Sequence, residues 1–470
     1  SGVERGLSAM SFVGVDIGQT GCKVLAFDVH GRPLASAYRE YAIISAHPGW
    51  AELDSRQVIE HCKDGLAEVA AAVRDEDPVT ALAVTSQGES FTVVGADGEF
   101  LCNGMITSDT RAQAQVNELT GRFGLQELYQ ITGHSPHTMF TLFKLAWLRE
   151  NRPAILDQAA RILCYGDLLG YELTGEAAID YSLAARTMCF DIRRKNWSER
   201  ILAEVGVQPS VLSCPVPSGQ VIGALRPALA RELGLSSRVA VVAGGHDQPC
   251  GALGSGVIGP GVAMYATGTV ECISPAFDAL LLNDTLRDAN LATYSHVVPG
   301  LYFTVAFSLT GGNLLRWFRD EFGQEEMRLA RESGQDVYDL LLAQIPAEPT
   351  SLLVLPHFTP TGTPYFDVSP VSAILGLSLS THRGQFIKAL LEGVTYEMRL
   401  NLDILAEAGV PVGELCAIGG GAKSEAWMQI KADIMGVPIV SLNVSEAACL
   451  GAALLAAVGS GAIASIPAAT

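Results

Sequence analysis

Short apolar runs broken by glycine open the chain and predict the strands of a sheet. Phe12–Gly18 and Val24–Asp28 form two such runs around a Thr-Gly-Cys-Lys turn, and Leu34–Tyr41 continues as a third strand after a reverse turn. Apolar residues at helical spacing follow over Ser55–Val73, and Ala81–Thr85 is another apolar strand. Three strands, a helix and a fourth strand in this order predict a mixed sheet covered by helices.

The second half of the chain repeats this pattern. Gly261–Val270 predicts a strand, a bend and a second strand, and Tyr294–Phe307 predicts a hairpin. The other predicted elements are helices from Asn313 and over Thr381–Ala408, a strand over Leu415–Gly421, a helix from Lys423, a strand over Val437–Val440 and an alanine-rich closing helix. Two similar halves predict an α/β protein with duplicated domains that face an interdomain cleft. We place these domains at residues 11–250 and 251–470, and expect residues 1–10 to be a leader or added segment outside the fold.

Length and charge narrow the class of protein. A chain of 470 residues, of which 49% are hydrophobic and 17% charged, fits a well-packed enzyme of two domains. The formal net charge of −19 disfavours a nucleic acid or an anionic membrane as partner, because it repels phosphate. The ten cysteines are scattered singly, as is typical of a reducing compartment, and the longest apolar stretch is too short to span a membrane. We therefore expect a cytoplasmic protein without nucleic-acid or membrane partners.

Three glycine-rich turns are candidates for holding phosphate groups. They are Asp16–Lys23, Ala266–Thr269 and Gly419–Ser424, and glycine lets a backbone approach phosphate closely. No P-loop or dinucleotide fingerprint stands where its strand–turn–helix context would require it. Each turn alone is a weak signal, but three together, one of them after a strand that carries an aspartate, indicate nucleotide binding.

Asp247 is the strongest single candidate for chemistry. It follows the apolar strand Val239–Ala243 and two glycines, near the junction of the two halves. This position fits a helix N-cap, and it equally fits the carboxylate that orients an attacking hydroxyl in phosphoryl transfer. We expect the neighbouring His246 to be a structural hydrogen-bonding group rather than an acid or base.

Two long gapped patterns resemble the signatures of the FGGY family of carbohydrate kinases. Met139–Asn151 fits the first signature at every constrained position, and Ser372–Leu377 with Gln385–Glu392 fits the second. The resemblance covers the chain from Phe12 to about Gly459. It implies two duplicated actin-like (ribonuclease H-like) domains, each a mixed sheet flanked by helices. It further implies an ATP-dependent kinase that phosphorylates a hydroxyl of a small sugar or polyol, uses Mg²⁺ and is commonly a homodimer.

The resemblance also assigns roles, residue by residue. Asp247 resembles the catalytic base, and Asp16 matches the aspartate that organises Mg²⁺, with Asp247 also counted at the metal. The positions that resemble those contacting or lying near the nucleotide are Thr20, Lys23, Thr267, Gly268, Gly312, Arg316, Gly421, Ala422 and Glu425. The resemblance places ATP in the second domain and the substrate in the first.

The predicted substrate-binding residues are Gln87, Gly88, Glu89, Met139, Asp247 and Gln248. Ser86–Ser90 resembles the glycerol kinase segment Asn-Gln-Arg-Glu-Thr, but Gly88 stands in place of arginine and Met139 in place of tyrosine. Losing both polar groups disfavours glycerol, because polar discrimination comes from buried donors paired with hydroxyls. The small Gly88 would leave room for a longer substrate. That substrate could be a ketopentose or a four- to six-carbon polyol. We favour a ketopentose such as xylulose, with a glycerol or other short-polyol kinase as the alternative and an actin- or Hsp70-like ATPase as a remote one.

Overall fold

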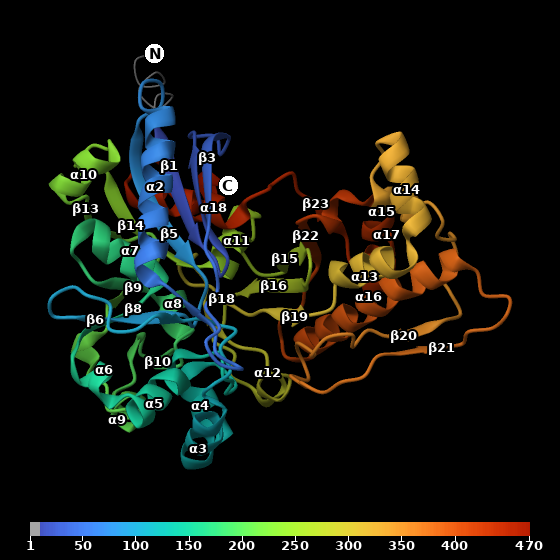
Figure 1. Cartoon of the computed structure of the whole chain (residues 1–470), viewed down its shortest axis with the longest axis horizontal. Helices are drawn as coiled ribbons and strands as arrows, with labels where there is room; N and C mark the ends of the chain where they lie inside the picture. Colours follow the sequence, from blue (N-terminus) through green and yellow to red (C-terminus); the bar gives the residue numbers. More distant parts are fainter. Residues whose placement is uncertain (1–9) are drawn as a thin grey trace. The chain divides into compact units, whose positions relative to one another are not determined.

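The computed structural model describes residues 10–470, so residues 1–9 of the predicted leader lie outside the described residues. Contacts divide the chain into two compact units (Figure 1). Unit 1 comprises the residues up to Ile258, Thr293–Phe303 and Glu446–Thr470; unit 2 comprises Gly259–Ala292 and Thr304–Ser445. The chain thus leaves and re-enters each unit, and the domain boundary near residue 250 stays a prediction. No helix within residues 10–470 is long and apolar enough to span a membrane.

Unit 1 is built on a six-stranded mixed sheet. Its strands are β1 (Ser11–Ile17), β2 (Gly21–Phe27), β3 (Pro33–Glu40), β5 (Val79–Ser86), β13 (Val221–Ala224) and β14 (Ala240–His246). They lie in the order β13-β14-β5-β1-β2-β3. β1 is antiparallel to β2 and parallel to β5, and β5 is parallel to β14. The predicted mixed sheet with its three-strand opening is confirmed.

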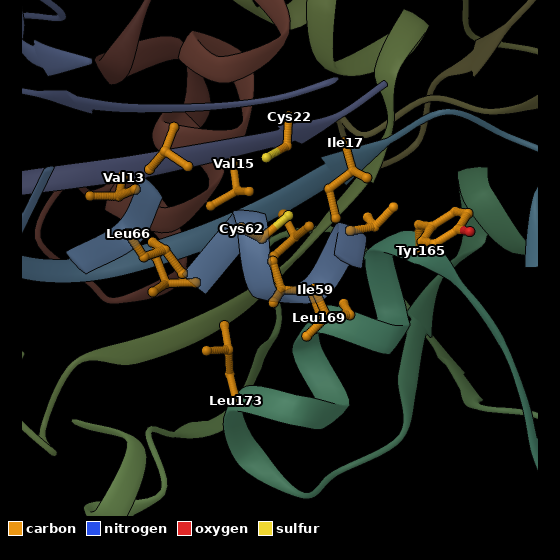
Figure 2. Close-up of a cluster of buried hydrophobic side chains, with 14 of the residues drawn as sticks. Val13, Val15, Ile17, Cys22, Ile59, Cys62, Leu66, Tyr165, Leu169 and Leu173 are labelled. Atoms are coloured by element: carbon orange, nitrogen blue, oxygen red, sulfur yellow. The ribbon is translucent and has the colours of Figure 1, made fainter. Parts of the chain in front are cut away.

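Helices cover both faces of this sheet because its central strands are apolar on both sides. Val13, Val15 and Ile17 point to one face and pack with α2 (Ser55–Val73), α7 (Tyr165–Thr174) and α10 (Pro227–Leu233), as Figure 2 shows for α2 and α7. Phe12 points to the other face and packs against α18 (Ala447–Gly459). The closing alanine-rich helix therefore packs on the sheet of unit 1. It approaches so closely that a Cβ added to Gly14 would lie 1.9 Å from the Cys449 carbonyl oxygen.

The remaining elements of unit 1 extend from the edges of this sheet. A second sheet has the order β4-β7-β6-β8, and short pairs join β9 with β12, β10 with β11 and β17 with β18. The bounds are β4 Glu52–Leu53, β6 Phe91–Gly95, β7 Gly104–Met105, β8 Ala159–Cys164, β9 Ala178–Asp180, β10 Phe190–Asp191, β11 Asn196–Trp197, β12 Cys214–Val216, β17 Tyr294–Ser295, β18 Tyr302–Phe303, α3 Gln113–Phe123, α4 Leu125–Thr132, α5 Thr141–Asn151, α6 Pro153–Asp157, α8 Tyr181–Ala185, α9 Glu199–Glu204, the 3₁₀ turn Pro209–Val211, α11 Asp247–Gly254 and α19 Ile466–Ala469.

Unit 2 repeats the central strands of unit 1. Its strands are β15 (Val262–Thr267), β16 (Glu271–Phe277), β19 (Ala306–Ser308), β22 (Glu414–Ile418) and β23 (Ile439–Ser441). β16 is antiparallel to both β15 and β19, while β22 is parallel to both β15 and β23. This is the order and direction of β3-β2-β1-β5-β14. The predicted duplication of the fold is confirmed.

Helices and a hairpin complete unit 2. Their bounds are α12 Asp284–Asp288, α13 Gly312–Phe322, α14 Gln324–Ser333, α15 Val337–Leu342, α16 Arg383–Glu407, α17 Glu425–Met435, the 3₁₀ turn Gly421–Lys423, β20 Leu353–Leu355 and β21 Ala373–Leu375. The helix predicted from Lys423 begins two residues later, because the Ser424 hydroxyl accepts the Trp427 N–H and caps α17.

Asp167, in the first turn of α7, is a buried carboxylate. We expect it to make the free energy of unfolding depend on pH. The Ser213 hydroxyl donates to one of its oxygens, while the other has no hydrogen-bond partner. Burial raises the pKa of Asp167 to about 7 from 3.8. The folded protein therefore holds this proton more tightly than the unfolded chain, and the free energy of unfolding falls as the pH rises from about 4 to about 7.

We expect Asp167→Asn, which cannot ionise, to gain stability relative to the wild type by about 2 kcal/mol between pH 5 and pH 8. Urea unfolding at the two pH values measures this difference. Asp75→Asn, at an exposed carboxylate of the same unit, is the matched control. Equal pH dependence of the two variants would contradict the expectation.

Candidate active site

The carboxyl ends of three parallel strands bring the predicted substrate-site residues of unit 1 together. Ile17 at the end of β1 and His246 at the end of β14 both pair with Ser86 at the end of β5. The residues that follow these strands leave the sheet side by side, at the edge where α/β sheets bind ligands. Asp16, the Gln87–Glu89 loop and Asp247 are gathered by this register.

Asp247 is the first residue of α11 and directly follows β14. The N-cap of this helix is His246, so Asp247 does not hold the N-cap position that its sequence context also allowed. Its Oδ1 lies 3.0 Å from His246 Nε2, and its side chain is 30% exposed. The carboxylate is thus held from one side by protein and open on another.

Negative charge gathers around Asp247. Desolvation raises the pKa of Asp247 well above its ordinary value, and the carboxylates of Asp16 and Glu89 raise it further, against the lowering effect of Arg186. Burial likewise raises the pKa of Asp16 to about 6, opposed by Lys23. Asp16 Oδ1 is buried and has no hydrogen-bond partner. A bound cation would neutralise these neighbouring carboxylates and give the unpartnered Asp16 oxygen a partner.

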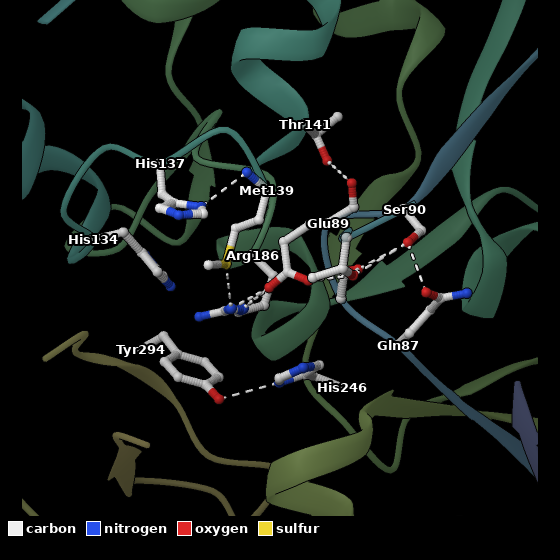
Figure 3. A network of polar contacts seen from close by, with 12 residues as sticks. Gln87, Glu89, Ser90, His134, His137, Met139, Thr141, Arg186, His246 and Tyr294 are labelled. Carbon is white, nitrogen blue, oxygen red and sulfur yellow. Dashed lines mark hydrogen bonds and ion pairs between the residues drawn. The ribbon is translucent and has the colours of Figure 1, made fainter. Parts of the chain in front are cut away.

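Glu89 is fixed by contacts on every side (Figure 3). It is buried, with the left-handed backbone angle φ 61° that non-glycine residues rarely adopt. The Thr107 hydroxyl donates to Glu89 Oε2 at 3.0 Å, and Arg186 forms an ion pair with Oε1. The Thr141 hydroxyl and Lys144 Nζ donate to its carbonyl oxygen at 2.9 and 3.3 Å.

Arg186 is a site residue that sequence reasoning missed. Its guanidinium lies 5.1 Å from the ring centre of Phe140 and 5.4 Å from that of Tyr294, and Nη2 lies 3.7 Å from Met139 Sδ. The single signal was an arginine inside the apolar run Leu-Ala-Ala-Arg-Thr-Met. Arg186 places a guanidinium beside Glu89, although Gly88 has no side chain to supply one.

The space beside Gly88 is occupied by protein. A Cβ added there would lie 3.1 Å from the His246 ring and 3.2 Å from Arg186 Cβ. The missing side chain at this position therefore makes room for two neighbouring side chains, which the sequence interpretation of a longer substrate did not anticipate.

The other predicted residues of unit 1 have mixed surroundings. The Gln87 amide donates to the Gly18 carbonyl at 3.1 Å and accepts the Ser90 hydroxyl at 3.0 Å, so it holds the loop in place. Gln248 Oε1 is buried without a hydrogen-bond partner. Thr20 is exposed in the turn after β1, and Lys23 Nζ lies 2.7 Å from Glu446 Oε2.

Unit 2 brings its glycine turns together. The Gly312 N–H, at the start of α13, donates to the Gly268 carbonyl at 2.9 Å. The Thr267 hydroxyl donates to the Ile418 carbonyl at 3.2 Å, and a Cβ added to Gly421 would lie 2.7 Å from Thr267 Oγ1. Bare backbone at the start of a helix is the usual setting for a phosphate group.

The remaining nucleotide candidates differ in exposure. Ala422 is buried in the 3₁₀ turn, whereas Arg316 on α13 and Glu425 at the start of α17 are exposed.

Known proteins of similar sequence and fold include xylulose kinases and an autoinducer-2 kinase. The xylulose kinase of Bacillus subtilis is 28% identical over 453 residues, which cover 96% of this chain and 88% of that protein. The autoinducer-2 kinase of Yersinia enterocolitica is 30% identical over 467 residues, covering 95% and 86%. The crystal structure of xylulose kinase from Rhodospirillum rubrum has a TM-score of 0.85 at 27% identity, covering 96% of this chain and 90% of that one.

The family models agree with these relatives. The model described as the FGGY family of carbohydrate kinases, N-terminal domain, matches residues 11–254, and that of the C-terminal domain matches residues 265–460. Both matches span the duplicated sheets described above. This chain belongs to the FGGY family of carbohydrate kinases.

Proposed function

We propose that this kinase transfers a phosphoryl group from ATP to a hydroxyl of a ketopentose, with xylulose the favoured acceptor and Asp247 as the general base. The observation that carries the proposal is the position of Asp247 at the strand ends of unit 1, beside Asp16 and Glu89. Relatives named xylulose kinase that match nearly the whole chain support the acceptor. Membership of a kinase family implies ATP as the donor.

The role of Asp247 follows from what phosphoryl transfer requires. Its transition state is loose, so the protein contributes mainly by positioning and by electrostatic stabilisation. The Asp247 carboxylate would orient the attacking hydroxyl and accept its proton. The Arg186–Glu89 ion pair and the buried Lys144 would keep the adjoining loop rigid, so that the hydroxyl meets the carboxylate in one orientation.

Asp16 fits the residue that would hold Mg²⁺, with Asp247 nearby. Asp16 Oδ1 is buried and lacks a partner, and the pKa values of Asp16 and Asp247 are both raised. Within residues 10–470 no group of three or more His, Cys, Asp or Glu side chains could hold a metal. Mg²⁺ keeps several waters and binds one or two carboxylates together with phosphate oxygens. The ion would supply charge neutralisation on the phosphates.

The glycine turns of unit 2 fit the nucleotide. Gly312 and Gly421 must be bare backbone, because a Cβ would lie 2.5 Å from the Gly268 carbonyl oxygen and 2.7 Å from Thr267 Oγ1, respectively. Thr267 fixes the spacing of two of these loops. The residues that would line or lie near the nucleotide here are Thr267, Gly268, Gly312, Arg316, Gly421, Ala422 and Glu425. Thr20 and Lys23 would contact phosphate from the first loop of unit 1.

A short polyol such as glycerol is the second candidate acceptor. Arg186 supplies a guanidinium beside Glu89, which replaces part of what is lost with glycine at position 88. Hydroxyl recognition by buried charged donors is the device that such a small acceptor needs. In either case the residues that would line the acceptor are Gln87, Gly88, Glu89, Met139, Asp247 and Gln248.

A panel of acceptors tests the proposal. ADP release from Mg-ATP is measured with xylulose, ribulose, glycerol, erythritol, xylitol, arabinitol, fuculose, rhamnulose, gluconate and autoinducer-2. We expect the highest kcat/KM with xylulose, and no ADP release without an acceptor. Highest activity with glycerol would favour the short-polyol alternative. ADP release that is independent of any acceptor would contradict a sugar kinase and favour an ATPase.

The oligomeric state and the cellular location of the protein are further predictions. We infer a homodimer from the state common among similar proteins, which light scattering of the purified chain would check. We infer a cytoplasmic location from ten free cysteines, which fractionation of the source cells would check.

A further inference from the structure

His246 connects the proposed base to a residue from a distant part of the sequence. On one side of its ring, Nε2 lies 3.0 Å from Asp247 Oδ1. On the other side, Nδ1 lies 3.1 Å from the Tyr294 hydroxyl. Figure 3 shows the Tyr294–His246 half of this chain. All three residues belong to unit 1, since the segment Thr293–Phe303 is part of it.

The chemistry of these groups allows one arrangement of protons when Asp247 is ionised. A carboxylate only accepts hydrogen bonds, so the imidazole must present Nε2–H to Asp247. The other nitrogen, Nδ1, is then an acceptor, and the Tyr294 hydroxyl must donate to it. The ionised Asp247 carboxylate therefore selects the imidazole tautomer, and the Tyr294 hydroxyl can serve as the donor that this tautomer needs at Nδ1.

The ring of His246 is held rigidly in this position. Its backbone N–H donates to the Ser182 hydroxyl at 2.9 Å, and its side chain is 6% exposed. The Gly88 backbone packs against the ring so closely that a Cβ there would stand 3.1 Å from Cδ2 and Nε2. A ring so confined cannot swing away from Asp247 without displacing its neighbours.

We propose that His246 is a positioning residue for the general base: its Nε2–H fixes the rotamer of the Asp247 carboxylate, and Tyr294 fixes His246. The proposal rests on the proposed function, in which Asp247 accepts the proton of the acceptor hydroxyl. In this role His246 transfers no proton and acts only through Asp247.

The charges around the ring agree with this role. The charged and titratable groups that act on His246 and Asp247 are Asp16, Glu89, His134 and Arg186. Burial, Arg186 and His134 lower the pKa of His246 well below its ordinary value. A neutral ring has one N–H and one lone pair, which is what the two partners require.

A pair of substitutions separates positioning from packing. His246→Gln keeps an amide N–H near the place of Nε2, whereas His246→Leu keeps an apolar side chain without a donor. With xylulose and Mg-ATP, we expect His246→Leu to lower kcat by at least about tenfold with KM for xylulose nearly unchanged, because the contact acts on the transition state. His246→Gln should recover most of kcat. Full kcat in His246→Leu, or a raised KM with kcat retained, would overturn the proposal.

Tyr294→Phe tests the second link. We expect a smaller loss of kcat than in His246→Leu, and no additional loss when Tyr294→Phe is combined with His246→Leu, since Tyr294 acts through His246. Additive losses in the double variant would show that Tyr294 acts independently, which contradicts the proposed chain.

The tautomer of His246 is measured in the wild-type protein and needs no activity. Two-bond ¹H–¹⁵N correlation of protein labelled at histidine nitrogens distinguishes the two neutral tautomers, and the signals missing from His246→Gln identify His246. We expect the proton on Nε2. A proton on Nδ1, or a charged ring at pH 8, would overturn the proposal even if His246→Leu fails to fold.

The same experiments distinguish failure of this inference from failure of the proposed base. Full activity in Asp247→Asn would show that Asp247 is not the general base, and the proposed role of His246 would then be wrong as well. An inactive Asp247→Asn variant beside a fully active His246→Leu variant would remove only the role of His246.

Discussion

Asp247→Asn should lose phosphoryl transfer by at least about a hundredfold while it still binds nucleotide. Asparagine has nearly the volume of aspartate, but its amide cannot accept the proton of the acceptor hydroxyl. The turns proposed to bind the nucleotide lie in unit 2, around Gly268 and Gly312, so we expect the substitution to leave them unchanged. Coupled ADP release measures transfer, and titration calorimetry with Mg-ATP measures binding.

The stability of Asp247→Asn distinguishes lost chemistry from lost folding. Asp16 and Glu89 both raise the pKa of Asp247, which means that they repel its ionised form. Removing the charge relieves that repulsion, so we expect the thermal midpoint of unfolding to stay the same or rise. Asp433→Asn, at an exposed carboxylate of α17, is the matched control and should keep full activity. Retained transfer in Asp247→Asn would refute the assignment of the base.

Lys431→Met should destabilise the protein by about 3–5 kcal/mol, because it leaves a buried carboxylate without its cationic partner. Lys431 Nζ lies 2.5 Å from Glu271 Oε1 and 2.6 Å from the Tyr265 hydroxyl, and the Lys431 and Glu271 side chains are fully buried. Burial lowers the pKa of Lys431, and the nearby Glu271 opposes this. Methionine fills a similar volume but supplies neither charge nor donor.

Urea unfolding followed by tryptophan fluorescence measures this loss, since Lys431 Nζ lies 4.6 Å from the ring centre of Trp427. The double variant Lys431→Met/Glu271→Gln removes both charges and should recover at least about half of the lost stability, because no unpaired charge then remains. Lys423→Met, at an exposed lysine of the neighbouring turn, controls for the loss of a surface charge. A loss below about 1 kcal/mol in Lys431→Met would contradict this account of the buried pair.

The fold was largely predictable because its signals are local. Apolar runs with glycine turns identified β1, β2 and β3, and helical spacing identified α2 and α16 within a few residues. The start of α17 was predicted only to within two residues, since the Ser424 cap and the preceding 3₁₀ turn depend on hydrogen bonds rather than on periodicity. The packing of α18 on unit 1 was not predictable, because an alanine-rich helix carries no signal for the sheet that it covers.

Some residues of the candidate site were likewise predictable from the sequence, and others were not. Asp16 lies near the end of a predicted strand, Glu89 and Asp247 each follow one, and a sequence shows such positions directly. Arg186 and Tyr294 reach the same place from a short helical turn and from a β-strand far along the chain. Their partners are set by the meeting of remote segments, which no local pattern encodes.

By itself the sequence determined the duplicated α/β architecture, the family signatures and the aspartates at the strand ends, because strand periodicity and turn chemistry act over a few neighbouring residues. Only the tertiary structure decided what surrounds those aspartates. The strand register brings Asp16 and Asp247 together, His246 and Arg186 occupy the space beside Gly88, and Tyr294 meets the His246 ring. These contacts arise from packing between segments distant in sequence, where close-packed side chains leave one arrangement of the site.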